Sequence, residues 1–138
     1  YKAHRDPKAL AAALREAAPN GIDCYFENVG GEIFNAVLAQ MNPFGRVALC
    51  GMIAGYDGEP IPLRDPSVML RMRLKVQGFI VSEHMALWPE ALKELGTAVA
   101  TGRLKYRETV AQGLAAAPEA FLGLLKGRNF GKQLVKLI

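Results

Sequence analysis

The residues with the clearest chemical meaning form the stretch Asp23-Cys24-Tyr25-Phe26-Glu27-Asn28-Val29-Gly30-Gly31. An apolar segment ends there in an asparagine and two glycines, and a segment with helical spacing of apolar residues follows at once. In open α/β sheets, ligands bind outside the carboxyl ends of the strands, where glycines allow close approach of the backbone and helix N-termini carry partial positive charge. Asn28 is expected at that edge, and the pattern indicates a nucleotide as the ligand.

A purely structural interpretation of the same residues stays open. An asparagine in a turn commonly bonds its own backbone, and Gly30 and Gly31 can simply be glycines that the turn requires. Because Asn28 is expected at a strand end, where α/β proteins bind ligands, the binding interpretation is favoured for Asn28. The sequence leaves the role of the two glycines undecided.

The rest of the chain alternates helical and strand patterns with short turns, which predicts βα units and a parallel sheet. The expected helices lie at 8–17, 31–41, 67–73 and 89–102, and the expected strands lie at 22–27, 46–50 and 75–81. Glycines and prolines between 52 and 66 predict a loop above the strand ends. This loop contains Tyr56 and can cover a ligand.

The pattern changes after residue 102. An extended segment at 104–110, a short helix at 118–125 and a final strand at 132–138 follow. This tail need not join the parallel sheet, and a chain of 138 residues offers little else to cover the apolar face of its last strand. We therefore expect a partner domain outside this sequence. The N-terminus, Tyr1-Lys2-Ala3-His4, is neither a signal peptide nor a natural start, so the chain is expected to begin inside a longer protein.

Composition narrows the class of protein. The chain is 51% hydrophobic and 22% charged, which is typical of an ordinary globular domain. Lys and Arg number 17 against 13 acidic residues, but the excess is spread along the chain, so no nucleic-acid partner is expected. No apolar run approaches the ~18 residues that cross a bilayer, so no membrane partner is expected.

The two cysteines, Cys24 and Cys50, both lie in predicted strands. So few cysteines exclude a disulfide scaffold and favour burial as small apolar residues, which fits a reducing, cytoplasmic location. Together with His4 and His84 they show no close ligand spacing, so the sequence predicts no metal site.

Four blocks of this sequence, in this order, resemble the C-terminal part of zinc-independent medium-chain dehydrogenases/reductases, in the branch of the prostaglandin reductases and alkenal double-bond reductases. The blocks are the stretch from Asp23 to Gly31, Phe44-Gly45-Arg46-Val47-Ala48-Leu49-Cys50-Gly51 leading to Tyr56, Gln77-Gly78-Phe79-Ile80-Val81, and Lys126-Gly127-Arg128-Asn129-Phe130-Gly131-Lys132. Each block alone is a weak signal, and the four together are a strong one.

The resemblance implies an α/β fold in two parts. Residues 1–102 would form the second half of a Rossmann-type parallel sheet with helices, and residues 103–138 a tail that returns to a GroES-like substrate domain mostly absent from this sequence. The Gly-rich pyrophosphate turn is absent too, since no G-x-G-x-x-G occurs.

The resemblance further implies NADP(H) as the cofactor. For the full-length protein it implies reduction of the carbon–carbon double bond of α,β-unsaturated aldehydes or ketones, of the 2-alkenal or 15-oxoprostaglandin type. No metal is required for this reaction. The fragment alone is expected to be a poor enzyme.

The resemblance also implies which residues contact the cofactor. These are Asn28, Cys50, Gly51, Met52, Ile53, Tyr56, Phe79, Ile80, Val81, Asn129 and Tyr1. Tyr56 is the candidate catalytic residue, as a proton donor, although a loop tyrosine is commonly only a cover over apolar surface. Tyr1, followed by Lys2, resembles a tyrosine that lies near the adenosine 2′-phosphate in this family.

One position departs from the family pattern. Some members carry a second tyrosine eight residues before the phenylalanine of the Gln-Gly-Phe block, and here that position is Arg71. Arg71 is either a cationic partner for the enolate or, as is commoner, a solvated helix arginine. The resemblance also implies a homodimer that pairs sheet edges through residues 77–82.

Two other functions stay open. The nearer is a quinone reductase of the same superfamily, which shares the fold and the cofactor but accepts a conjugated ring. The more distant is a nucleotide-binding or scaffold protein without turnover, for which the missing second tyrosine is the hint. A substrate panel separates the first from an alkenal reductase, and cofactor binding without NADPH oxidation would indicate the second.

Overall fold

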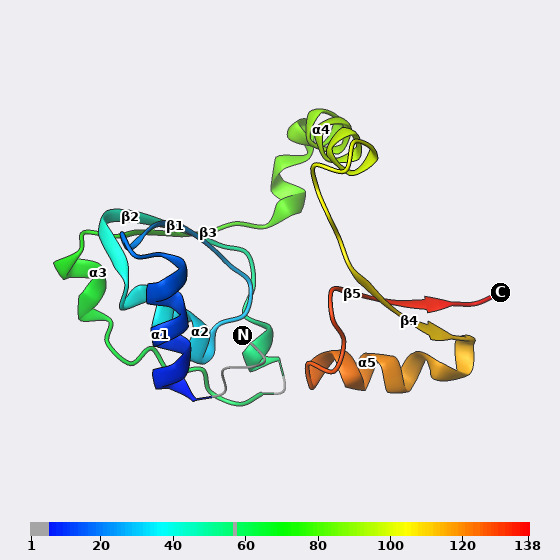
Figure 1. The fold of residues 1–138 in the computed structure, drawn as a ribbon, viewed down its shortest axis with the longest axis horizontal. Helices are drawn as coiled ribbons and strands as arrows, with labels where there is room; N and C mark the ends of the chain where they lie inside the picture. The colour runs from blue at the N-terminus through cyan, green and yellow to red at the C-terminus, as the bar shows by residue number, and fades with distance from the viewer. Residues whose placement is uncertain (1–5, 57) are drawn as a thin grey trace. The chain divides into compact units, whose positions relative to one another are not determined.

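A computed structural model describes residues 6–56 and 58–138, and the chain divides into two compact units (Figure 1). The first unit spans Tyr1–Val81 and the second spans Ser82–Ile138. The predicted boundary at residue 102 rests on a different criterion, the change from a nucleotide-binding domain to a substrate domain. That boundary stays a prediction.

The first unit contains a three-stranded parallel sheet in the order β1-β2-β3. Its elements are α1 (Pro7–Ala17), β1 (Ile22–Glu27), α2 (Gly31–Leu38), β2 (Met41–Leu49), the 3₁₀ turn η1 (Ile53–Gly55), α3 (Ser67–Arg71) and β3 (Lys75–Gly78). In the ladder Phe26 lies opposite Ala48, which lies opposite Gln77. The predicted α/β architecture with parallel strands is confirmed.

Helix α1 begins and ends where local chemistry requires it. The carboxylate of Asp6 accepts a hydrogen bond from the Ala9 N–H at 2.8 Å, and Pro7 takes the first helical position, where a missing N–H leaves no bond unmade. At the other end the Ala18 N–H donates to the Leu14 carbonyl at 2.8 Å. The helix predicted at 8–17 is thus confirmed, with one more residue at its start.

The core of the first unit lies between the sheet and helix α2. Figure 1 shows α1 and α2 on the same face of the sheet. The buried core residues are Phe34, Val37, Leu38, Met41, Val47 and Val68. The Phe34 ring stacks on Tyr25 of β1, with ring centroids 6.4 Å apart. This packing follows from the helical spacing of apolar residues in α2, and it holds the start of α2 at the carboxyl end of β1.

Four elements of the first unit have other bounds than predicted. Helix α2 ends at Leu38 instead of residue 41, because Met41 pairs with Ile22 and so belongs to β2, before an irregularity in the ladder. Strand β2 therefore spans Met41–Leu49 instead of 46–50, and α3 ends at Arg71 instead of residue 73. Strand β3 stops at Gly78, because the chain soon enters a 3₁₀ segment, η2 (Val81–Leu87).

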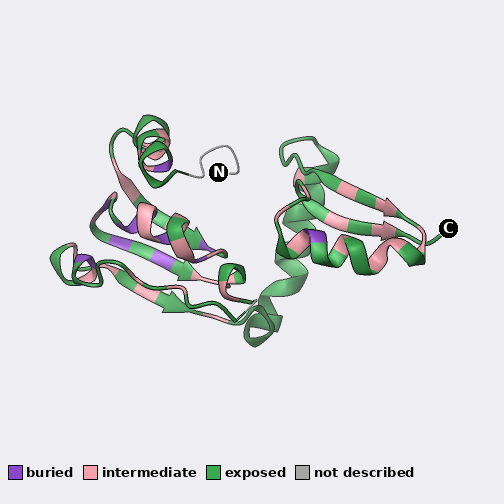
Figure 2. Cartoon of the chain, turned by 90° about the horizontal axis from the view of Figure 1, so that it is seen from below, coloured by how far each residue is buried: buried purple, intermediate pink, exposed green. Residues whose placement is uncertain are grey.

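The other face of the sheet is exposed within the first unit. Successive strand residues point to opposite faces, so Cys24 and Phe26 share the face that lies away from Tyr25 and α2. Cys24 is exposed and Phe26 keeps 59% of its surface accessible. Figure 2 shows exposed residues among the buried ones along the strands of this unit. The expected burial of Cys24 is therefore wrong, since the first unit's helices α1 and α2 lie on the opposite face. Cys50 is half-buried.

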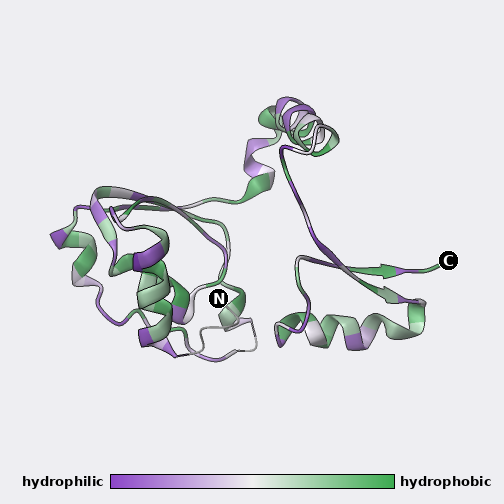
Figure 3. Cartoon of the chain, in the orientation of Figure 1, coloured by the Kyte–Doolittle hydropathy of each residue, from purple (hydrophilic) through white to green (hydrophobic). Residues whose placement is uncertain are grey.

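The second unit contains a separate two-stranded parallel sheet. Its elements are α4 (Trp88–Ala100), β4 (Glu108–Gln112), the 3₁₀ turn η3 (Leu114–Ala116), α5 (Ala117–Leu125) and β5 (Lys132–Lys136). Helix α5 contacts β5, and Figure 3 shows hydrophobic residues along both. In the ladder Val110 lies opposite Leu134, and both side chains are exposed. The tail thus forms its own sheet with one open apolar face.

The helices found between residues 6 and 56 and between 58 and 138 are all too short or too polar to span a bilayer.

Candidate functional site

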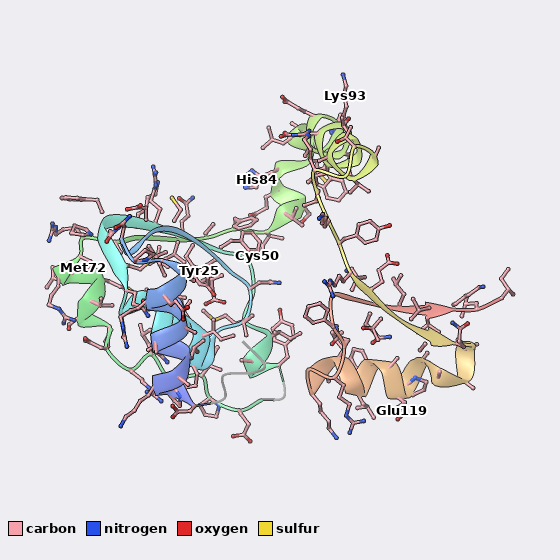
Figure 4. All side chains as sticks on the ribbon, in the orientation of Figure 1. Tyr25, Cys50, Met72, His84, Lys93 and Glu119 are labelled. Atoms are coloured by element: carbon pink, nitrogen blue, oxygen red, sulfur yellow. The ribbon has the colours of Figure 1, made fainter. Side chains whose placement is uncertain are left out.

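The loops that follow β1 and β2 are joined into one surface. The backbone carbonyl of Glu27 accepts hydrogen bonds from the N–H groups of Cys50, at 2.8 Å, and Gly51, at 3.2 Å. Further on, the Ala54 N–H donates to the Val29 carbonyl at 2.9 Å. Cys50, labelled in Figure 4, follows directly after β2. The carboxyl edge of the sheet is therefore built from both loops together, as parallel neighbouring strands require.

Asn28 is exposed at this edge and lies against Gly51. A Cβ atom on Gly51 would lie 2.6 Å from Asn28 Oδ1, so a side chain at position 51 requires the amide to move. The Asn28 amide makes no hydrogen bond within residues 6–56 and 58–138. The turn N–H groups of Val29 and Gly30 donate to the Glu27 carboxylate instead. The interpretation of Asn28 as a residue that bonds its own turn is thus not what the structure shows, and its amide is available to a ligand.

Gly30 has a structural role in the same turn. It precedes α2 with a φ of 81°, a conformation that residues with a Cβ rarely adopt, and an added Cβ would lie 3.3 Å from Ile61 Cδ1. Gly31 follows with a φ of 60°. The turn itself therefore accounts for both glycines, without a role in ligand binding.

The loop after β2 lies over the start of α2, as predicted. The Asn35 side chain donates to the Pro62 carbonyl at 3.1 Å and accepts from the Arg64 N–H at 2.9 Å, which fastens the loop to the helix. Beneath it is an apolar cavity of about 210 Å³ whose lining includes Gly30, Met52 and Ile61. The loop thus closes over apolar surface close to the carboxyl edge.

Tyr56 follows the 3₁₀ turn of this loop. Its N–H donates to the Ile53 carbonyl at 3.2 Å, and 68% of its surface is exposed. A tyrosine that covered apolar surface of its own unit would be more buried. The exposure leaves the hydroxyl accessible, and the proton-donating role of Tyr56 stays a prediction.

The chain leaves β3 at the same edge of the sheet. The Phe79 N–H donates to the Leu49 carbonyl at 3.2 Å, and the Phe79 ring lies 6.2 Å from the Phe26 ring. Ile80 and Val81, which follow, are both largely exposed. The structure therefore brings Phe79 to the ends of β1 and β2, together with Asn28 and Cys50.

Two predicted contacts are not brought to this edge. Asn129 lies in the second unit, where its side-chain nitrogen donates to the Gly131 carbonyl at 2.7 Å. Tyr1 lies outside the described residues. The roles of both residues in cofactor binding stay predictions.

Arg71 lies at the other end of the sheet. It ends α3, which leads into the start of β3, and Figure 4 shows Met72, the next residue, at the end of the unit away from Cys50. Its guanidinium lies 2.8 Å from the Asp65 carboxylate, and this hydrogen bond, with that of Ser67, lowers the pKa of Asp65 to about 2. The pair is solvent-exposed. The interpretation as a solvated arginine is therefore supported, and a partnership with an enolate is not.

Sequence reasoning missed Glu27 as a residue of this site. Its side chain is fully buried at the end of β1, with Oε1 bonded to the turn and Oε2 without a hydrogen-bond partner. Burial, followed by the charge of Glu27 and a hydrogen bond to it, raises the pKa of Tyr25 to about 12. The available signal was a carboxylate at the last position of the predicted strand, directly before the turn residues Asn28-Val29-Gly30-Gly31.

Side chains that could hold a metal ion do not cluster in the described part of the chain: no group of three or more His, Cys, Asp or Glu residues is found there.

Comparison with known proteins identifies several relatives. The family model described as "Zinc-binding dehydrogenase" matches residues 2–97. Prostaglandin reductase 1 of Rattus norvegicus is 43% identical over 136 residues, which cover 96% of this chain and 41% of the rat protein. The 2-alkenal reductase (NADP(+)-dependent) of Nicotiana tabacum is 42% identical over 98% of this chain and 39% of the tobacco protein.

A solved structure shows the same arrangement. The crystal structure of CurA from Vibrio vulnificus in complex with NADPH matches with a TM-score of 0.84 at 39% identity, over 98% of this chain and 42% of CurA. The match lies in the C-terminal portion of CurA. The chain thus spans about two fifths of the length of each of these relatives.

Proposed function

Because the chain belongs to the zinc-binding dehydrogenase family of medium-chain dehydrogenases/reductases, we propose that it is the C-terminal part of an NADPH-dependent reductase of carbon–carbon double bonds. The proposed substrates are α,β-unsaturated aldehydes and ketones of the 2-alkenal or 15-oxoprostaglandin type. The observation that carries the proposal is the joined edge after β1 and β2, where the Asn28 amide is exposed and unpaired beside Gly51. The names of the rat and tobacco relatives support the substrate class.

The residues at this edge fit a dinucleotide. The Asn28 amide offers both a donor and an acceptor, which suits the paired hydroxyls of a ribose. Gly51 carries no side chain, so a ligand can approach the backbone closely there. We propose that residues 50–53 and 79–81, which follow β2 and β3, contact the cofactor from the ribose to the nicotinamide. NADP(H), when bound, supplies the hydride.

The protein's own contribution is orientation and polarisation. A reductase must hold the alkene close to the donor face and must place a hydrogen-bond donor where the carbonyl oxygen becomes negative. We propose the exposed Tyr56 hydroxyl for this second task. A Tyr56→Phe variant is expected to lower kcat by about tenfold or more with the Kd for NADPH unchanged, as loss of a proton donor does. A variant with full turnover would remove this role.

The division of the chain follows from the same proposal. Residues 1–102 would complete a Rossmann domain whose first half, with the pyrophosphate turn, lies outside this sequence. Residues 103–138 would return to the GroES-like substrate domain, and the exposed Val110 and Leu134 on the open face of their sheet are consistent with such a neighbour. We also propose a homodimer formed through the edge strand β3.

The experiment that tests the proposed function is NADPH oxidation by the full-length protein. The absorbance of the nicotinamide is followed with a medium-chain 2-alkenal and a quinone in parallel, and the products are identified. Faster turnover of the alkenal, with the saturated aldehyde as product, is the expected result. Turnover of the quinone alone would move the assignment to a quinone reductase, and NADPH binding without turnover of either would indicate a scaffold protein.

A further inference from the structure

Glu27 accepts hydrogen bonds from both loops at the carboxyl ends of β1 and β2. Its backbone carbonyl receives the N–H groups of Cys50 and Gly51, and its side-chain Oε1 receives those of Val29 and Gly30, the latter at 2.8 Å. Four backbone donors from two loops thus converge on one residue. Among the described residues, it is also the one charged side chain that is fully buried.

The burial of this carboxylate is energetically unfavourable. Oε2 is buried and has no hydrogen-bond partner, and an incompletely paired buried carboxylate is unfavourable. Asn28, which stands in the turn, could accept the Gly30 N–H as in an Asx turn, but Glu27 accepts that N–H together with the N–H of Val29. The carboxylate thus replaces the Asn28 side chain as the acceptor of the turn.

The effect of the arrangement is visible at Asn28. Because Glu27 accepts the N–H groups of Val29 and Gly30, the Asn28 side chain makes no hydrogen bond in the turn. Its amide lies at the exposed edge beside Gly51. Tyr25, on the same face of β1, lies close enough to the carboxylate for the charge of Glu27 to contribute to the raised pKa of its phenol. The carboxylate thus lies beside the Tyr25 phenol and accepts the hydrogen bonds of the turn.

We propose that Glu27 is a positioning residue for cofactor binding, which acts by fixing the turn 28–30 so that the Asn28 amide is presented to the ligand. This inference rests on the proposed function only in that NADPH is the ligand. Glu27 itself does not touch the cofactor, since it is fully buried. Its loss therefore acts on binding through Asn28.

The test compares three variants of the full-length protein. Glu27→Ala removes both acceptor oxygens, Glu27→Gln keeps one oxygen for the turn N–H groups, and Glu16→Gln is the matched control, because Glu16 is an exposed glutamate of α1. The Kd for NADPH is measured by nicotinamide fluorescence, the KM of the alkenal and kcat by turnover, and folding by thermal unfolding. We expect Glu27→Ala to raise the Kd for NADPH by about tenfold or more and Glu27→Gln to recover most of that loss. The Kd of Glu16→Gln and the KM of the alkenal should change by less than about twofold.

A double-variant cycle distinguishes positioning from a general structural role. With Asn28→Ala already present, Glu27→Gln and Glu27→Ala should raise the Kd by less than about twofold further, because the group that Glu27 positions is gone. Losses that simply multiply would overturn the inference, as would an unchanged Kd in Glu27→Ala. If Glu27→Ala does not fold, Glu27→Asp, which keeps the charge but shortens the side chain by one methylene, replaces it in both measurements.

The outcomes also separate this inference from the proposed function. A full-length protein that binds NADPH but reduces no alkenal would contradict the proposed substrate class, and the Kd measurements on Glu27 would stand unaffected. A protein that does not bind NADPH would overturn both.

Discussion

At the scale of single residues, the missing side chain of Gly51 leaves room for the Asn28 amide. An added Cβ would lie 2.6 Å from Asn28 Oδ1, so a Gly51→Ala protein must move the amide away. We expect the Kd for NADPH to rise by about tenfold, roughly 1.4 kcal/mol of binding free energy. Fluorescence titration measures it, with Gly96→Ala as the control, since a Cβ at Gly96 meets nothing within 4 Å. Unchanged binding by Gly51→Ala would show that the amide can act from another position.

Tyr25 gives the molecule a pH dependence above neutrality. The pKa of its phenol rises from the ordinary 10.0 to about 12, chiefly because the ring is partly buried and secondly because of the charge of Glu27. The folded state thus holds a proton that the unfolded state loses earlier, so the stabilisation is complete below pH 10 and is lost as pH rises towards 12. We expect the stability difference between the wild type and Tyr25→Phe to shift against the wild type between these pH values, measured by denaturant unfolding. A difference independent of pH in that window would contradict the raised pKa.

At the scale of elements, Met41 lies in the core between α2 and the sheet. Met41 follows α2 and begins β2, and only 1% of its surface is exposed. Met41→Ala should lower the free energy of unfolding by about 2–5 kcal/mol, because it removes buried apolar contact and leaves a cavity. Leu70→Ala is the control, since Leu70 on α3 is 80% exposed, and such surface changes stay within about 0.5 kcal/mol. Equal losses of unfolding free energy in urea for the two variants would contradict the difference in burial between Met41 and Leu70.

Hydrogen bonds between elements hold the carboxyl edge together. The loop after β2 donates backbone hydrogen bonds to Glu27 and Val29, and further along it is fastened to α2 through Asn35. Each of these bonds is individually modest, but together they fix the position of side chains that stand on turns. A binding group on a loop is useful only when the scaffold below it is fixed, which the two joined loops provide.

At the scale of the whole molecule, β3 presents an unpaired edge. The Phe79 N–H points inward to Leu49, so the backbone groups of Gly78 face away from β2 by the alternation of a strand. If the proposed dimer pairs these edges, Gly78→Pro removes an outward donor and should convert the dimer of the full-length protein into a monomer in light scattering. Circular dichroism checks that the variant is folded. A wild-type protein with the mass of a monomer would refute the dimer.

The sequence by itself determined the α/β architecture, the presence of three parallel strands and the place of Asn28 after the first of them. These follow from local patterns: apolar periodicity, the glycines that stop a strand, and prolines that open helices. The resemblance between Asp23 and Lys132 in four blocks also sufficed for the family, which the comparison confirmed. Each of these signals is carried by residues close together in the chain.

Only the tertiary structure decided which faces and edges these elements share. Met41 joined β2 because Ile22 was there to pair with it, and Cys24 became exposed because α1 and α2 lie on the other face of the sheet. Arg71 was separated from the site for a similar reason, since α3 leads into the opposite end of β3. The burial of Glu27 and its hold on two loops depend on contacts between residues far apart in the chain, which local propensity does not encode.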